Sequence, residues 1–151
     1  MAFLASLKRW LNPEVPDATQ PDPVLAASVA LMAEIMRADG TYDPQEREAL
    51  LNLLMTQSGC SAEVGQTLMA EAETAVEEAH DLFQFTSLIN AHCDAEARIA
   101  IVEQLWKVAF ADGNLDQHEQ HLIKRIADLL YVRHSDVITS KQRARAAVLG
   151  A

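Results

Sequence analysis

Six carboxylates lie in two short segments of the chain that repeat one another. Residues 38–46 and 111–119 both read Ala-Asp-Gly-x-x-Asp-x-x-Glu, so that Ala38 corresponds to Ala111 and Glu46 to Glu119. Carboxylate oxygens are the ligands that hard cations such as Ca²⁺ and Mg²⁺ prefer. The candidate metal ligands are therefore Asp39, Asp43, Glu46, Asp112, Asp116 and Glu119.

The number of carboxylates limits the kind of cation site that these segments could form. Each segment supplies three carboxylates, which is fewer than the ligand set of an EF-hand loop. Backbone carbonyls and water would have to complete the coordination shell, so we expect weak, solvent-rich binding of Ca²⁺ or Mg²⁺. A second arrangement uses both segments together, if the fold brings them close to each other.

The same residues also have a structural explanation. In each segment the second Asp can cap the helix that follows, and the Glu three residues later can complete a capping box. The Gly suits a tight turn. Only the first Asp, Asp39 or Asp112, then has no assigned structural role. A third interpretation treats the acidic segments as a surface for a protein partner.

Histidines beside the second segment offer a different metal chemistry. His118 and His121 lie three residues apart on one helical face, and with Asp116 they could ligate Zn²⁺ or Ni²⁺. The first segment has Gln45 and Glu48 at the equivalent positions. We therefore expect exposed histidines without this role, and Zn²⁺ ranks below Ca²⁺ and Mg²⁺.

No sequence pattern in the chain indicates an enzyme. The phosphate-binding loop, the dinucleotide-binding glycine motif, the G-x-S-x-G nucleophile motif and the H-E-x-x-H zinc motif are all missing. Paired carboxylates could act in acid–base catalysis, but helix capping explains the same residues. We therefore predict no catalytic residues and a non-enzymatic protein.

The elements that position these segments are predicted to be helices. The chain has five prolines, none of them after Pro44, and only 5% aromatic residues. Apolar periodicity and capping residues predict seven core helices in two pseudosymmetric halves. The first spans residues 23–38 and the third residues 61–79. The others begin near Asp43, Asp81, Asp94, Asp116 and Ser135.

The N-terminal residues are set apart from this all-α core. Residues 2–11 predict a short amphipathic helix, and prolines in residues 12–23 predict an extended linker. We divide the chain into an N-terminal segment, residues 1–20, and a helical domain, residues 21–151. Residues 2–11 could pack on the domain or on a second copy of the chain, or contact a membrane surface.

Charge and cysteine content restrict the partners and the compartment. Net charge is −10, with −12 in residues 21–133, which argues against nucleic acid as a partner. Cys60 and Cys93 are isolated and are expected to be reduced thiols, as in the cytoplasm. No apolar run is long enough for a transmembrane helix.

The two acidic segments with their flanking residues resemble the tellurite-resistance protein B-like (TerB-like) family, in a single-domain bacterial subgroup. The similarity is carried by residues 35–46 and 105–119, with support from residues 81–86 and 129–136. The resemblance implies two pseudosymmetric helical halves, a cytoplasmic setting, and a link to tellurite and other stress resistance. It also implies divalent-metal binding at acidic residues and scaffolding near the inner membrane, and it brings no catalytic reaction.

Two functions follow as expectations. The first is a non-enzymatic, cytoplasmic, stress-associated module that binds a divalent cation weakly at the paired acidic turns. The second is a metal-independent scaffold for a protein partner or for another copy of itself, held near the inner membrane by residues 2–11. Metal-dependent stabilisation of the fold distinguishes the first from the second.

Overall fold

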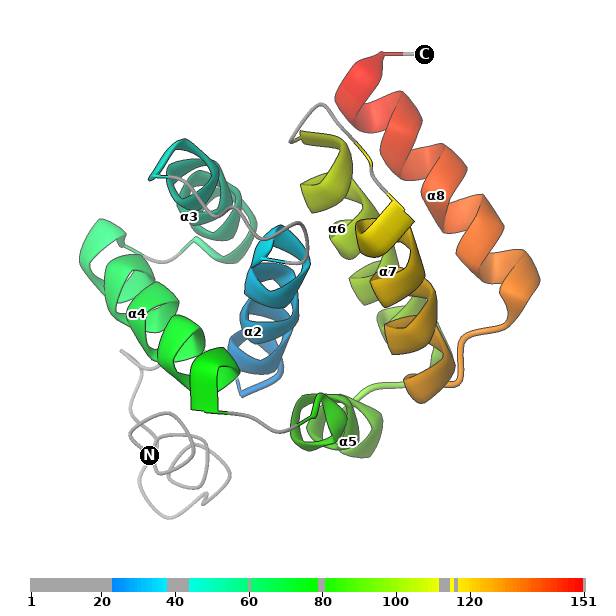
Figure 1. The fold of residues 1–151 in the computed structure, drawn as a ribbon, viewed down its shortest axis with the longest axis horizontal. Coiled ribbons are helices and arrows are strands. Elements are labelled where there is room, and N and C mark those ends of the chain that lie inside the picture. The colour runs from blue at the N-terminus through cyan, green and yellow to red at the C-terminus, as the bar shows by residue number, and fades with distance from the viewer. Residues whose placement is uncertain are drawn as a thin grey trace.

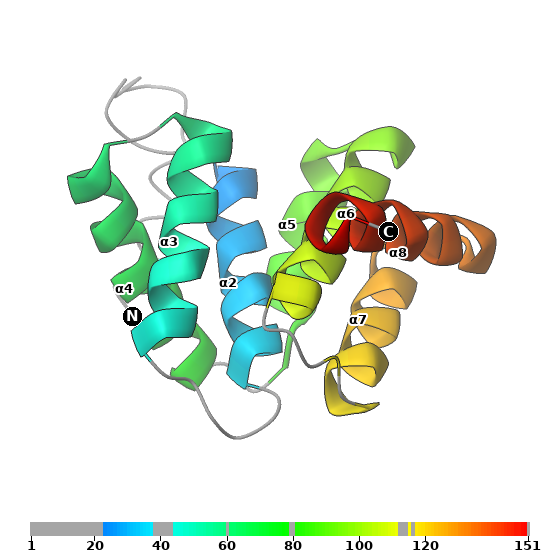
Figure 2. The same cartoon turned by 90° about the horizontal axis from the view of Figure 1, so that it is seen from above.

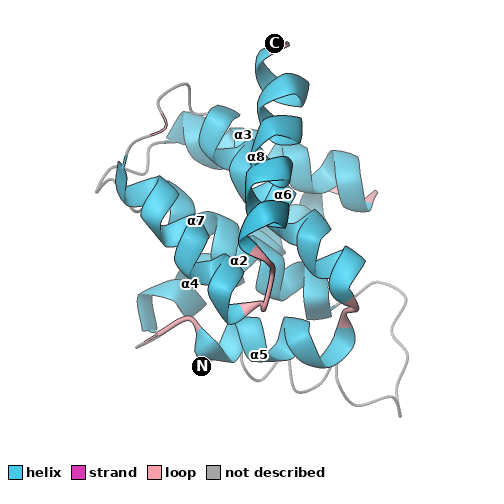
Figure 3. Ribbon diagram, turned by 90° about the vertical axis from the view of Figure 1, so that its right-hand side faces the viewer, coloured by secondary structure: helices cyan, strands magenta, loops and turns pink. Residues whose placement is uncertain are grey.

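Seven helices and no strand make up the described part of the chain in the computed structural model. That part comprises residues 23–37, 44–59, 61–78, 81–111, 115 and 117–150. The helices are α2 (Pro23–Arg37), α3 (Pro44–Ser58), α4 (Ala62–Glu78), α5 (Phe83–His92), α6 (Ala95–Ala111), α7 (Gln117–Leu129) and α8 (His134–Leu149). The prediction of an all-α protein is confirmed (Figure 1, Figure 3).

Helix α2 is the centre of the core. It packs against α3, α4, α5, α6 and α7, and residues 26–33 are all buried. A helix that is apolar on every side must be buried, and its alanines let neighbouring helices approach closely. The one polar side chain in this stretch, Ser28, donates its hydroxyl to the carbonyl of Val24 at 2.7 Å, which satisfies the buried group.

The repeat of the acidic segments extends to whole helices. Helices α2, α3 and α4 precede α6, α7 and α8 by nearly the same offset that relates Ala38 to Ala111, and α5 connects the two halves. The most extensive contact within the first half is between α2 and α4, and within the second half it is between α6 and α8. The helices that correspond in sequence therefore pack in corresponding pairs.

Equivalent positions on α3 and α7 also make equivalent polar links. Arg47 on α3 pairs with Glu73 on α4, with 3.0 Å between Nε and Oε1. Gln120 on α7 occupies the position of Arg47 in the second copy of the repeat, directly after Glu119 as Arg47 follows Glu46. It accepts a hydrogen bond from Lys141 on α8 at 3.1 Å. The same repeat position therefore links α3 to α4 in the first half and α7 to α8 in the second half.

Most helix starts agree with the capping residues that the sequence predicts. Ser61 accepts a hydrogen bond from the amide of Val64 at 3.2 Å, and Asp94 accepts one from the amide of Ala97 at 2.8 Å. Ser135 does not cap α8, so that prediction was wrong. The helix already begins at His134, after an extended Arg133 whose side chain makes no cap. Ser135 is thus inside the first turn.

Other sequence predictions lie outside the described residues. They include the amphipathic helix 2–11, the linker before Pro23, the glycines of the two acidic turns and Cys60.

Candidate functional site

The helix ends that flank the two acidic turns gather at one end of the molecule. Helix α2 ends at Arg37 before the first turn, and α3 begins at Pro44 after it. The second turn separates the end of α6 at Ala111 from the start of α7 at Gln117. The C-terminal end of α2 and the N-terminal ends of α3 and α7 all lie in the lower part of Figure 2. Helix α2 also packs against α7, so these three helix ends belong to neighbouring elements on one side of the molecule.

Of the six candidate ligands, the structure describes one side chain. Asp39, Asp43, Asp112 and Asp116 lie outside the described residues, and Glu46 is placed in the first turn of α3 by its backbone alone. Glu119 lies in the first turn of α7 and is 2% exposed. How close the six carboxylates come to one another stays a prediction.

The burial of Glu119 is unusual for a carboxylate. Glutamate is almost never fully buried unless its charge is compensated, because removing an ionised carboxylate from water is costly. The first turn of a helix offers such compensation, since its amide groups and its dipole favour negative charge. A cation bound at the adjacent turn would add to this, so the position of Glu119 suits both a capping-box residue and a metal ligand.

A metal site independent of the two turns is not present in the part that the structure describes. No group of three or more His, Cys, Asp or Glu side chains converges there.

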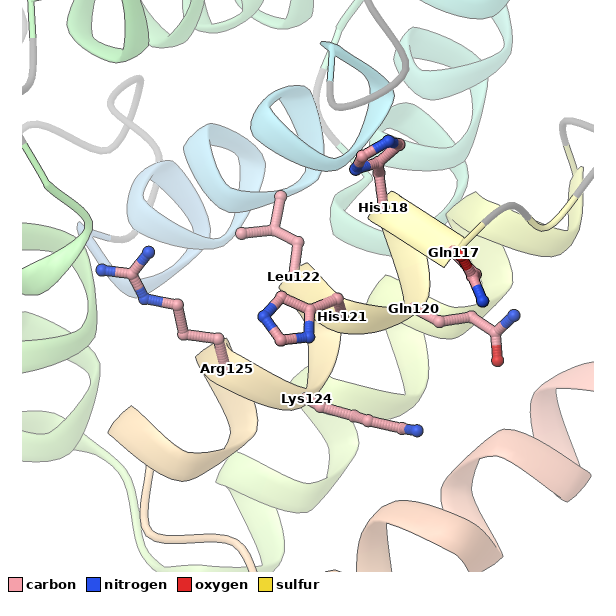
Figure 4. A pocket seen from close by; sticks show the side chains of 7 residues that line it. All are labelled: Gln117, His118, Gln120, His121, Leu122, Lys124 and Arg125. Carbon is pink, nitrogen blue, oxygen red and sulfur yellow. The ribbon is translucent and has the colours of Figure 1, made fainter.

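The exposed face of α7 carries positive and neutral polar groups beside the second turn. A cavity of about 540 Å³ runs along this face. Figure 4 shows its lining, which consists of Gln117, His118, Gln120, His121, Leu122, Lys124 and Arg125. His118 points toward the C-terminal end of α2.

Both histidines are exposed, as the sequence analysis expected. Their imidazoles could ligate a metal or attract an anion. Asp116, the acidic residue predicted to join them in a Zn²⁺ site, lies outside the described residues.

Sequence reasoning missed the burial of Glu119 and the polar links at the repeat positions of Arg47 and Gln120. Extending the repeat by one residue beyond Glu46 and Glu119 would have identified Arg47 and Gln120 as equivalent positions. Helical periodicity could have signalled the burial, because Glu119 lies four residues before Ile123 and seven before Ile126, on the apolar face of α7.

In the described part of the chain, no helix combines the length and the apolar character needed to span a bilayer.

Comparison with known families identifies the family of the chain. The family model described as tellurite resistance protein TerB matches residues 25–142, which include both acidic turns. No curated protein and no solved structure matches the chain.

Proposed function

The chain belongs to the tellurite resistance protein TerB family, and from that premise we propose that it is a non-enzymatic, stress-associated cytoplasmic module that binds a divalent cation weakly at its two acidic turns. The family name links the chain to tellurite resistance. The carboxylates of the turns indicate which cation would bind, because their oxygen ligands prefer Ca²⁺ or Mg²⁺ over Zn²⁺.

The observation that carries this proposal is the placement of the helix ends. Helices α3 and α7 begin at equivalent positions of the acidic repeat, and both begin on the side where α2 ends (Figure 2). A cation shared by the two turns, or one partner that contacts both, requires the flanking helix ends to lie on one side of the molecule, as these do.

The proposal is tested by thermal melting of chelator-treated protein with added Ca²⁺, Mg²⁺, Mn²⁺ or Zn²⁺. A cation that binds only the folded state stabilises it by about 2.7 kcal/mol at 100 times its dissociation constant. We expect a saturable rise in Tm with one ion, and no rise in the double variant Asp39→Asn, Asp112→Asn. Equal responses of parent and variant to every ion would reject the proposal.

A metal-independent scaffold is the second candidate. It is favoured by two aromatic side chains on the surface, Phe83 at 65% exposed and Tyr131 at 77% exposed, because exposed aromatic residues are enriched at protein interfaces. In this alternative no ion shifts the melting temperature. The acidic body would then meet a basic partner.

A further inference from the structure

An apolar groove lies between the two halves of the molecule. Helices α2 and α3 border it on one side, and α6 and α8 border it on the other, with a cavity volume of about 300 Å³. Its lining is mainly apolar and includes Met36, Leu50, Val108 and Val148, with Asn52, Thr56 and Lys107 as its polar residues. The groove is separate from the polar cavity along α7, because the two share no lining residue.

The groove is better suited to apolar side chains than to water. A water molecule takes up about 30 Å³ of liquid and needs several polar partners to be held in a cavity. The floor of the groove is buried, with Leu50 at 1% and Val108 at 2% exposed, whereas Val148 at the edge is 37% exposed. The groove is therefore open to solvent at the edge near Val148. An apolar side chain that fills it would bury apolar surface and stabilise the fold.

We propose that the apolar face of residues 2–11 of the same chain docks in this groove. Phe3, Leu7 and Trp10 are spaced four and three residues apart, so a helix would present all three on one side. These residues lie outside the described part of the chain.

The connecting segment is long enough for this docking. Residues 12–22 number eleven and, as an extended proline-rich linker, span about 3.1 Å per residue, or roughly 34 Å. Helix α2 begins at Pro23, and Met36 at the groove lies about 20 Å further along the helix axis, at 1.5 Å per residue. The linker therefore exceeds this distance by about 14 Å, which leaves length for it to pass over the helices that bury α2 and reach the groove.

Charge favours the same arrangement. Lys8 and Arg9 give residues 2–11 a charge of +2, whereas residues 21–133 carry −12. Lys107, the one charged residue in the groove lining, is paired with Glu103 at 3.8 Å, and Glu48, next to the lining residue Ala49 in the sequence, is exposed. A basic segment is thus attracted to this body at ordinary ionic strength.

Limited trypsin digestion of the full chain tests the proposal, because trypsin cleaves after Lys8 and Arg9. The groove variant is Val148→Asp, and its matched control is the neighbouring Leu149→Asp, whose residue is 53% exposed and does not line the groove. We expect Val148→Asp to speed cleavage after Arg9 about tenfold, as for a docking free energy of about 1.4 kcal/mol. The control should be cleaved at the parent's rate. Equal rates in all three proteins would overturn the proposal.

Tryptophan quenching gives a second readout that does not depend on proteolysis. Trp10 and Trp106 are the two tryptophans, and Trp106 is 0% exposed, so quenching by iodide reports mainly on Trp10. Docking predicts weak quenching in the parent and strong quenching in Val148→Asp. Protection that grows with protein concentration would point to a second copy instead, and protection only with anionic lipid vesicles would point to a membrane. Either result would overturn docking within one chain.

Discussion

Trp106 has the largest side chain among the fully buried residues of the described part. Its ring stacks on Phe110, with 6.3 Å between ring centroids, and Lys141 of α8 places its ammonium 5.1 Å from the ring centroid. Trp106 therefore joins α6 to α8 both by apolar contact and by a cation–π contact.

Replacing Trp106 by Ala should lower the free energy of unfolding by about 3–5 kcal/mol, because it leaves a cavity in the core. Urea denaturation measures this. The control Phe83→Ala removes an aromatic side chain that is 65% exposed, and we expect a change within about 0.5 kcal/mol. A loss in Trp106→Ala no larger than about 0.5 kcal/mol would show that the contact between α6 and α8 does not depend on the buried indole.

Tyr131 is strained in the turn between α7 and α8. It is the one non-glycine residue with positive φ in the described part, at 57°, and its side chain is 77% exposed. A side chain costs about 1–2 kcal/mol in this left-handed conformation, whereas glycine adopts it freely.

Tyr131→Gly should therefore be more stable than Tyr131→Ala by about 1 kcal/mol. The alanine variant removes the ring but keeps the strain, so comparing the two isolates the backbone effect. Chemical denaturation of both variants provides the measurement. If the glycine variant is no more stable than the alanine variant, the backbone at position 131 is not strained.

The helix starts show which predictions local sequence supports at the scale of elements. Asp94 caps α6 through its hydrogen bond to the amide of Ala97 at 2.8 Å. Ser135 was predicted to cap α8 but lies within the first turn. Asp94→Ala should cost about 1 kcal/mol of stability.

Ser135→Ala is the matched control for this cap, and we expect a change within about 0.5 kcal/mol. Both are measured by the shift of the urea midpoint. A loss at Ser135 as large as that at Asp94 would restore the prediction from sequence.

Helix number and most boundaries could be predicted because they depend on local periodicity, caps and breakers. The predicted helices 23–38 and 61–79 are observed as Pro23–Arg37 and Ala62–Glu78. Glu119 and Trp106 follow the apolar periodicity of α7 and α6, but the helices that cover them could not be predicted, because that depends on tertiary packing. The repeat indicated two halves, but not that α8 would cover α6 as α4 covers α2.

At the scale of the whole molecule, each pseudosymmetric half of the fold contains one copy of the acidic motif. Both copies follow the ends of helices that contribute to the core, α2 and α6, and precede helices that begin on the same side as each other (Figure 2). The net charge of −10 raises the local concentration of cations around such a body, and salt screens this effect. A specific site must therefore be distinguished from general attraction of cations to an acidic protein.

Isothermal titration calorimetry of the chelator-treated chain, with the cation that raises its Tm most, makes that distinction. The parent is compared with the variant Asp39→Asn, Asp112→Asn. The control is Glu77→Gln, Glu78→Gln, which removes two charges from the exposed end of α4. Cation binding at the turns predicts saturable heat in the parent and the control and none in the turn variant. Equal heat in all three proteins, or none in the parent, would contradict it.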